Sequence, residues 1–388
     1  MRTAAYIHIP FCEHICHYCD FNKVFLKNQP VDQYIDSLLI EMKRTIERAS
    51  IDTLKTIYIG GGTPTALSAE QLKHLFDGMH RILPMQDLVE FTVEVNPDSG
   101  EEDKLQVMKE AGVNRLSIGV QSFDTSLLQG IGRTHTSHSV YDAVQRSRQA
   151  GFDNISLDLM FGLPNQSVEQ FIDTIEKASV LGVEHVSAYS LKIEEKTVFF
   201  NRQRKGKLSL PPEDDEVTMY QELQARTKQN GFDQYEISNF AKPGYESQHN
   251  LVYWNNDEYY GFGAGAHGYV NGVRNHNIGP ISKYIQAIES GDLPYLQEHR
   301  VTKVEQIEEA MFMGLRKLAG VNLSTLSTRY NVDLKEVYRD QITNLTKRGL
   351  LEQDGDVLRL TDDGLLLANE VFEQFLAVLN EDMEKNES

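Results

Sequence analysis

The sequence predicts an α/β fold built on a parallel sheet, because short β-branched runs alternate with longer amphipathic segments. The expected strands cover residues 5–9, 56–59, 91–95, 115–119, 155–161 and 185–190, and the expected helices cover 31–49, 69–83, 101–111, 139–150 and 168–181. Gly112, Gly151 and Gly182 each follow a helical run, where a left-handed cap is favoured. Ser68 and Gln71 form a capping-box pattern before the second helix. This alternation alone leaves both an open sheet and a partial barrel as alternatives.

The composition is that of a globular chain with a sizeable core: 388 residues, 40% hydrophobic and 24% charged. No run approaches the ~18 apolar residues that span a bilayer, and His8 and Pro10 interrupt the N-terminus before a signal-peptide core. Three cysteines are too few, and odd in number, for a disulfide framework. We therefore expect a cytoplasmic protein without a transmembrane segment.

Charge argues against nucleic acid as a partner. The formal net charge is -19, from 38 Lys and Arg against 57 Asp and Glu. Residues 301–388, the part that most resembles a DNA-binding module, hold 10 basic and 17 acidic residues. A polyanion is repelled by such a surface unless a local basic stripe overrides the repulsion.

The pattern changes after residue 192 and again after residue 300. Residues 193–300 form an extension with a helix expected at 214–230, and residues 235–280, rich in Gly, Asn, Tyr and His, predict site-forming loops more than regular elements. Helices expected at 323–330 and 334–348, followed by strands around Asp354-Gly355, predict a winged-helix-like module over 301–379. The expected domains are thus 1–192, 193–300 and 301–379, with a frayed tail at 380–388.

The three cysteines, Cys12, Cys16 and Cys19, fall within eight positions directly after the first strand. Three thiolates on one loop can hold three irons of a [4Fe-4S] cluster and leave the fourth iron open to an external ligand. The alternative is a Cys3His zinc site that uses His14 or His17. Structural zinc sites usually draw ligands from two knuckles, so the single loop favours the cluster.

The spacing C-x3-C-x2-C after a strand resembles the radical S-adenosylmethionine (SAM) superfamily. The resemblance implies a partial (β/α)6 barrel, in agreement with the six strand–helix units, and SAM chelation of the open iron through its amino and carboxylate groups. Tyr18 stands where the superfamily packs an aromatic ring on adenine. Residues 60–64 (GGGTP) follow the second strand, where the superfamily binds the SAM amino group; glycines permit such a close approach of backbone to ligand.

Other polar residues stand at strand ends, among them Glu94, Gln121 and Asp158. Asp158 lies inside an apolar strand, which is costly unless it is bound or paired; a buried salt bridge to Arg133 is the alternative. These segments resemble the oxygen-independent coproporphyrinogen III oxidase family over nearly the whole chain. The resemblance implies SAM contacts at Tyr6, Tyr18, Gly61, Gly62, Thr63, Glu94, Gln121, Arg133 and Asp158, and at Lys192 through its backbone.

Two features place the chain within that family. The decarboxylating oxidases carry the cysteine pattern C-x3-C-x2-C-x-C. In this chain Phe21 occupies the position of the fourth cysteine, which resembles the branch described as haem chaperones. Residues 249–254 (HNLVYW) match a motif of the same branch. The resemblance implies that His249 ligates haem iron while Tyr253 and Trp254 pack the macrocycle. A hydrogen-bonded structural role is the alternative for His249, and His267 is a second candidate ligand.

The resemblance therefore implies a haem chaperone that binds haem b and transfers it to an unidentified acceptor protein, with a [4Fe-4S] cluster and SAM as cofactors. Peripheral membrane association with an acceptor is compatible with this function. The first alternative is an oxygen-independent coproporphyrinogen III oxidase, which forms protoporphyrinogen IX by radical oxidative decarboxylation. The second alternative is a zinc-stabilised binding module. No catalytic residue is assigned.

Overall fold

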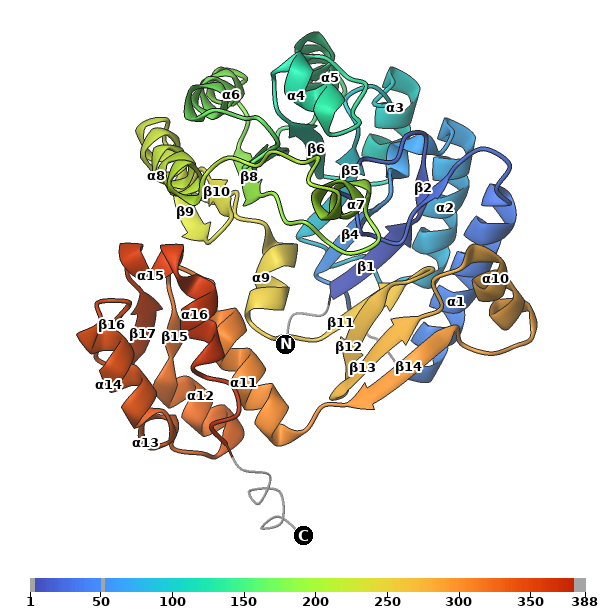
Figure 1. The fold of residues 1–388 in the computed structure, drawn as a ribbon. Helices are drawn as coiled ribbons and strands as arrows, with labels where there is room; N and C mark the ends of the chain where they lie inside the picture. The colour runs from blue at the N-terminus through green and yellow to red at the C-terminus, as the bar shows by residue number, and fades with distance from the viewer. Residues whose placement is uncertain (1–3, 50–52, 380–388) are drawn as a thin grey trace.

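The computed structural model describes residues 4–49 and 53–379, so the expected frayed tail at 380–388 lies outside the described residues. Its central feature is a mixed 12-stranded sheet whose strands run in the order β14-β13-β12-β11-β1-β4-β5-β6-β7-β8-β10-β9 (Figure 1). Among the helices of these ranges, none combines the length and apolar character needed to cross a membrane.

The six expected parallel strands are confirmed at the centre of this sheet, where each pairs in parallel with the next. They are β1 (Ala4–Ile9), β4 (Thr56–Gly61), β5 (Glu90–Val95), β6 (Arg115–Gln121), β7 (Ile155–Phe161) and β8 (His185–Ser190). Their side chains alternate between two faces. Ile57 and Val93 belong to the buried apolar core, whereas Tyr58, Ser117 and Asp158 line cavities on the inner face. The sheet is therefore a partial barrel with a polar interior.

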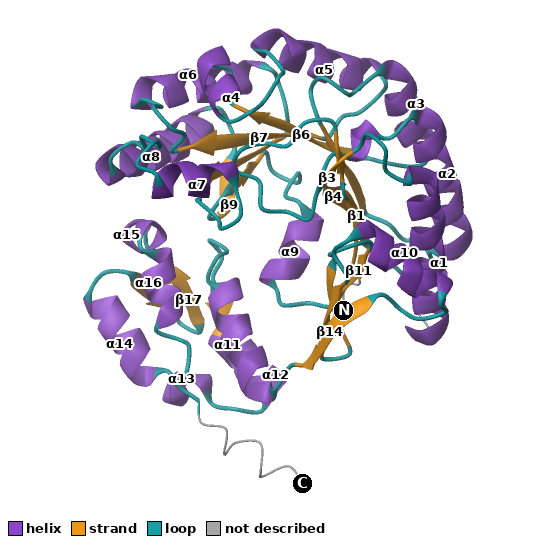
Figure 2. Cartoon of the chain, turned by 45° about the vertical axis from the view of Figure 1, so that its right-hand side comes forward, coloured by secondary structure: helices purple, strands orange, loops and turns teal. Residues whose placement is uncertain are grey.

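The expected helices cover the outer face of the sheet as an arc (Figure 2). They are α1 (Val31–Ala49), α2 (Ala69–Ile82), α3 (Glu102–Glu110), α5 (Ser137–Gln149), α6 (Val168–Val180) and α8 (Glu213–Gln229), all confirmed to within two residues. Six short elements were not predicted from the sequence. They are the helices α4 (Thr125–Gly130), α7 (Val198–Arg204) and α10 (Ile281–Glu289), the 3-10 helix η1 (Pro64–Ala66), and the two-residue strands β2 (Phe11–Cys12) and β3 (Val24–Phe25).

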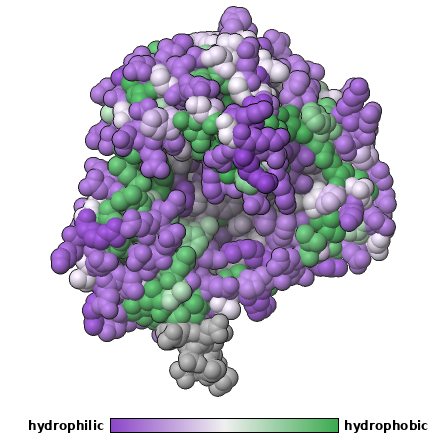
Figure 3. Space-filling model, viewed as in Figure 1, coloured by the Kyte–Doolittle hydropathy of each residue, from purple (hydrophilic) through white to green (hydrophobic). Residues whose placement is uncertain are grey.

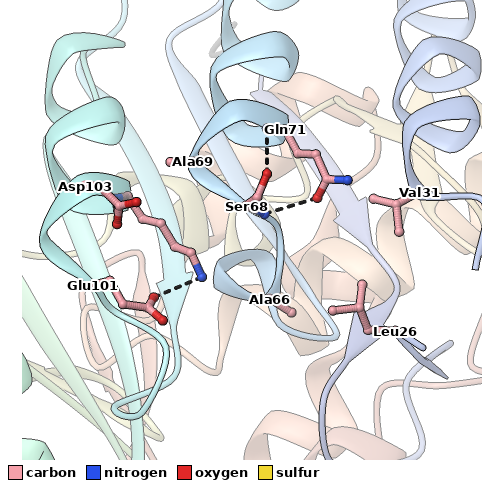
Figure 4. Close-up of a pocket in the computed structure, with 9 residues that line it drawn as sticks. Leu26, Val31, Ala66, Ser68, Ala69, Gln71, Glu101 and Asp103 are labelled. Atoms are coloured by element: carbon pink, nitrogen blue, oxygen red, sulfur yellow. Dashed lines mark hydrogen bonds and ion pairs between the residues drawn. The ribbon is translucent and has the colours of Figure 1, made fainter. Parts of the chain in front are cut away.

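The expected capping box at the start of α2 is present (Figure 4). The Ser68 hydroxyl accepts from the Gln71 backbone N–H at 3.2 Å, and the Gln71 side chain accepts from the Ser68 N–H at 3.1 Å. Both bonds satisfy donors that a helix start would otherwise leave unpaired. They fix the direction in which the chain leaves the glycine-rich segment that follows β4.

The prediction of loops over residues 235–280 is wrong. This segment contains β10 (Asn239–Ala241), α9 (Gln248–Trp254), β11 (Tyr259–Phe262), β12 (His267–Val270) and β13 (Val273–Asn277); β9 (Asp233–Glu236) and β14 (Tyr295–Arg300) flank it. Gly265 and Gly272 lie in turns with positive φ, as the pattern suggests, whereas Gly261 and Gly268 permit close strand approach. A Cβ on Gly261 would lie 1.8 Å from the His267 carbonyl oxygen, and one on Gly268 would lie 3.0 Å from the Gly261 nitrogen.

These elements extend the barrel sheet at both edges. Strand β11 pairs in parallel with β1, and β10 pairs antiparallel with β8. Helix α9 lies inside the ring, facing the open side of the barrel, which the C-terminal helices border (Figure 2). The segment 193–300 therefore shares one sheet with the first 192 residues, and its treatment as a separate domain stays a prediction.

The C-terminal module has the expected helices and hairpin. Strands β15 (Val321–Asn322), β17 (Val357–Leu360) and β16 (Leu351–Asp354) form a small sheet packed beside α11 (Lys303–Gly314), α12 (Leu323–Tyr330), α15 (Asp362–Leu366) and α16 (Ala368–Glu373). The single helix expected over 334–348 is instead two, α13 (Leu334–Val337) and α14 (Arg339–Lys347), divided at Tyr338, whose φ of -101° and ψ of 16° depart from helical values.

Candidate functional site

A cavity of about 450 Å³ lies at the carboxyl ends of the barrel strands. In α/β barrels this end carries the functional residues. The three cysteines line it together with nine of the ten positions implied for SAM: Tyr18, Gly61, Gly62, Thr63, Glu94, Gln121, Arg133, Asp158 and Lys192. Residues spread over 180 positions of sequence thus share one site.

The cysteine loop is tied to the rest of the barrel by backbone hydrogen bonds. The Val24 N–H donates to Pro10 at 2.8 Å and the Leu26 N–H donates to Cys12 at 2.8 Å, which closes the loop on itself. The His17 N–H donates to the Ile131 carbonyl at 2.9 Å, and Nδ1 of its ring lies 3.0 Å from the Gly130 carbonyl oxygen. His17 therefore anchors the loop to the end of α4.

The three thiols differ in burial. Cys12 is buried, and Cys16 and Cys19 are half-buried. Burial raises the pKa of the Cys12 thiol to about 11, although a hydrogen bond from the Thr63 hydroxyl, 3.7 Å from Sγ, opposes the shift. Within the described ranges, no three His, Cys, Asp or Glu side chains are grouped so as to hold a single metal ion. Phe21 lines the same cavity and is 63% exposed.

Glu94 is a half-buried carboxylate of the site. Its Oε1 accepts from the Tyr58 hydroxyl at 2.9 Å, and its Oε2 accepts from the Gly61 N–H at 3.1 Å. Burial, and secondarily the nearby Asp158, raises the pKa of Glu94 to about 7. Gly61 has a φ of +112°, and a Cβ there would lie 2.4 Å from the His8 ring. Only glycine fits at this position, and its backbone positions the carboxylate.

Arg133 and Gln121 lie together over Gly119, where a Cβ would be 3.2 Å from an Arg133 amino nitrogen and 3.3 Å from Gln121 Nε2. The Arg133 guanidinium donates to the Tyr18 hydroxyl at 3.3 Å. Its buried Nε and the Gln121 Oε1 have no hydrogen-bond partner among the described residues. Buried unpaired polar atoms are costly, so both point to a ligand that pairs with them.

Asp158 does not form the salt bridge considered from the sequence. Its Oδ1 accepts from the Ser117 hydroxyl at 2.9 Å, and none of the ion pairs among the described residues joins it to Arg133. Burial raises the pKa of Asp158 to about 6, against the opposing influence of Ser117, Arg115 and Arg133. The carboxylate is therefore bound by a neutral neighbour and remains directed at the cavity.

Two implied SAM positions differ from the rest. Tyr6 is not among the residues that line the cavity; its ring stacks on Tyr58 at 6.2 Å between centroids, and its hydroxyl lies 3.0 Å from His8 Nδ1. Tyr6 thus supports the Tyr58–Glu94 pair from behind. Lys192 lines the cavity, and its side chain is 83% exposed and pairs with Glu194 at 2.7 Å; the expected SAM contact through its backbone stays a prediction.

His249 has the hydrogen-bonded arrangement that was the alternative to iron ligation. It is 1% exposed, its Nδ1 lies 2.9 Å from the Thr56 hydroxyl, and its Nε2 lies 2.9 Å from the Tyr253 hydroxyl. Burial, and secondarily the charge of Arg115, lowers the pKa of His249 to about 3. Neither ring nitrogen is free to ligate iron in this arrangement. Tyr253 packs edge-on against Tyr259, with the ring centroids 4.7 Å apart.

The remaining haem candidates are more accessible. Trp254 is half-buried, the Arg316 guanidinium lies 4.6 Å above its ring, and its indole N–H is unpaired. His267 is exposed and stacks on His276 with ring centroids 4.0 Å apart. Burial of part of the ring, together with His276 and Arg274, lowers the pKa of His267, so its ring favours the neutral form that binds metals.

Comparison with known proteins identifies the family. Residues 6–178 match the model of the radical SAM superfamily, and residues 301–367 match that of the HemN C-terminal domain. A Bacillus subtilis protein named heme chaperone HemW is 52% identical over 377 residues, which cover 97% of this chain and 100% of that protein. The chain belongs to the HemW haem chaperone family. The HemW protein of Escherichia coli is 35% identical over 374 residues, 96% of this chain and 97% of its own length.

Solved structures agree on the fold. The coproporphyrinogen III oxidase HemN of Escherichia coli, described as a radical SAM enzyme, superposes with a TM-score of 0.84 at 23% identity, covering 97% of this chain and 91% of that chain. This chain and HemN thus share an architecture from the barrel through the C-terminal module. Membership of the radical SAM superfamily implies a [4Fe-4S] cluster and SAM.

Several residues that shape the cavity of this chain were not predicted from the sequence. Tyr58 and Ser117 hold the two carboxylates, and Met160 and Tyr189 line the wall. The signal was available for two of them, because Tyr58 and Ser117 each precede an inward-facing glycine by two positions along a strand. Strand alternation identifies such residues once one inward-facing neighbour is known.

Proposed function

We propose that the chain binds haem b and transfers it to an acceptor protein, and that Cys12, Cys16 and Cys19 hold a [4Fe-4S] cluster whose open iron binds SAM. The 52% identity with a relative named heme chaperone, over the full length of that relative, carries this proposal. Phe21 supports it, because an exposed phenylalanine stands in the cavity where the oxidase pattern requires a fourth cysteine. The chain therefore lacks the fourth cysteine that the oxidase alternative requires.

The residues of the cavity fit the two cofactors. Three free thiols line one cavity, and a glycine cradle beside them leaves no room for side chains. Arg133 and Gln121, each with an unpaired buried atom, line the space that SAM would fill. Glu94 would accept from the SAM amino group, and Tyr18 would pack on its adenine. When bound, a reduced cluster and SAM supply one-electron chemistry; the barrel orients SAM and limits water around it.

The cargo needs an accessible ligand for its iron, and we assign His267 to that role in preference to His249. His267 is exposed, whereas His249 would have to break hydrogen bonds to Thr56 and Tyr253 first. Phe21 offers apolar surface beside the cavity for the macrocycle. Because a cluster needs reduced thiols and all three cysteines are free, a cytoplasmic location is part of the proposal.

The test separates the chaperone from the oxidase. The protein is reconstituted anaerobically with iron and sulfide and incubated with reductant, SAM and coproporphyrinogen III, with the Escherichia coli HemN enzyme as the positive control. We expect no vinyl-bearing product from this chain, and we expect haem to co-elute with it in gel filtration. Product formation at a rate comparable to the control, without haem retention, would replace the proposal with the oxidase.

A further inference from the structure

A second polar cavity of about 300 Å³ lies deeper in the barrel, beside the cofactor site. It shares Ser117, Asp158 and Tyr189 with that site and continues toward α9 and the turn after α11. The space-filling view shows the molecule hollowed near the centre of this face, between the barrel and the C-terminal module (Figure 3). None of the residues assigned to the cluster occurs in its wall.

The wall of this cavity carries unpaired N–H donors. The Nε of Arg115, the Nε of Arg316 and the indole Nε1 of Trp254 are all buried and have no hydrogen-bond partner among the described residues. Arg115 is 2% exposed, which makes it the largest fully buried side chain of the described chain. Among the described residues that line the cavity, one buried acceptor, Oε2 of Glu236, is also unpaired. A site with more free donors than free acceptors suits an acceptor-rich ligand.

The three donors come from distant parts of the sequence, and Arg316 is held in place by its neighbours. Arg115 opens β6, and Trp254 ends α9. The Arg316 guanidinium lies over two rings, 4.6 Å from the Trp254 centroid and 5.9 Å from the Phe372 centroid. Its backbone carbonyl accepts from the Ile237 N–H at 3.1 Å. Rigid placement lowers the entropy that a ligand must overcome to bind.

Charge in the cavity is balanced in the absence of a ligand. Arg115 and Arg316 face Asp158 and Glu236, and burial raises the pKa of both carboxyl groups. Glu236 already accepts from the Ser238 N–H at 3.0 Å and from the Asn239 side chain, and Asp158 accepts from Ser117. Each carboxyl group therefore has a partner within the protein through one of its oxygens, whereas neither arginine Nε has one.

We propose that Arg115 and Arg316, with the indole N–H of Trp254, form a binding site for a carboxylate. Guanidinium groups recognise carboxylates through paired, charge-assisted hydrogen bonds. Haem carries two propionates, so the proposed function favours haem as the source of the carboxylate. The choice of haem rests on the proposed function, whereas the carboxylate site does not. A free small carboxylic acid has the same chemistry and is the other source.

The experiment compares haem with haem dimethyl ester, whose propionates are neutral, by Soret titration of the full-length reconstituted protein. Wild type should bind haem at least tenfold more tightly than the ester, and Arg115→Gln should abolish this difference. Arg316→Gln gives an independent second variant if Arg115→Gln fails to fold. Arg81→Gln, an exposed change on the outer helix α2, should retain the preference.

A second arm identifies the source of the carboxylate. Thermal unfolding is measured with sodium succinate against sodium chloride at equal ionic strength. If haem and its ester bind equally while succinate stabilises wild type and not Arg115→Gln, the site stands and a free acid is its ligand. If neither the preference for haem over its ester nor the stabilisation by succinate depends on Arg115 or Arg316, the cavity holds only water and the proposal is overturned. If wild type binds no haem at all, the haem chaperone proposal fails, while the succinate arm still decides the carboxylate site.

Discussion

The burial of His249 makes a quantitative prediction about stability and pH. The ring is 1% exposed with both nitrogens bonded, and its pKa is lowered to about 3 from its usual value of 6.5. As the pH falls below 6.5, the unfolded chain binds a proton at this residue while the folded chain does not. Folded His249 therefore costs stability between pH 6.5 and about 3, and the cost is about 1.4 kcal/mol at pH 5.5.

The change that tests this is His249→Gln, which removes the titration. The free energy of unfolding is measured by urea denaturation, followed by far-UV circular dichroism, at pH 8 and at pH 5.5, the lower value being set by the pI of 5.1. Loss of the bonds to Thr56 and Tyr253 should destabilise the variant at pH 8 by roughly 2–4 kcal/mol. At pH 5.5 the difference between wild type and variant should shrink by about 1.4 kcal/mol.

His138→Gln is the matched control, because the His138 side chain is 85% exposed and lies on an outer helix. Its effect on the free energy of unfolding should be below about 0.5 kcal/mol at both pH values. A wild-type-minus-variant difference for His249 that stays constant between pH 8 and pH 5.5 would refute the burial argument. It would also return His249 to the set of accessible iron ligands.

Four further predictions concern the cofactor and cargo sites. Cys16→Ala should abolish the iron–sulfur absorption after anaerobic reconstitution, and an unchanged spectrum and sulfide content would reject the cluster. Glu94→Gln should weaken SAM binding about tenfold in equilibrium dialysis, since a neutral amide replaces a half-buried carboxylate. Gly61→Ala should lower stability by more than about 2 kcal/mol, because its φ is +112° and its Cβ would meet the His8 ring at 2.4 Å; a thermal midpoint equal to wild type would contradict this. His267→Ala should shift the Soret band and weaken haem binding about tenfold, an outcome that unchanged titration curves would exclude.

Most of the barrel could be predicted from the sequence because its signals are local. Strand β7, for example, is mostly apolar apart from Ser156 and Asp158. The two capping-box residues of α2 stand three positions apart in the sequence. The resemblance to the radical SAM superfamily implied one site for the cysteine loop, the glycine-rich segment and the strand-end carboxylates. In the structure these residues line one cavity at the carboxyl ends of the parallel strands. Placement of Glu94 and Gly61 in mutual contact follows from that geometry.

The elements of residues 235–280 could not be predicted because a glycine can either form a turn or let two strands approach closely. Local sequence treats a glycine such as Gly261 or Gly268 as a turn former, whereas here both permit two strands to approach closely. The orientation of His249 is similarly non-local. Its partner Thr56 lies 193 positions away on β4, so only the assembled barrel shows that the ring is buried and bonded. Recognition of a motif identified the family and left the roles of its side chains open.

The most direct test of the account is a haem titration of the anaerobically reconstituted protein, followed through the Soret band. If the chain binds haem as proposed, we expect saturation near one haem per chain with a dissociation constant in the low micromolar range or tighter. Absorption that rises without saturation, and haem that separates from the protein in gel filtration, would contradict it.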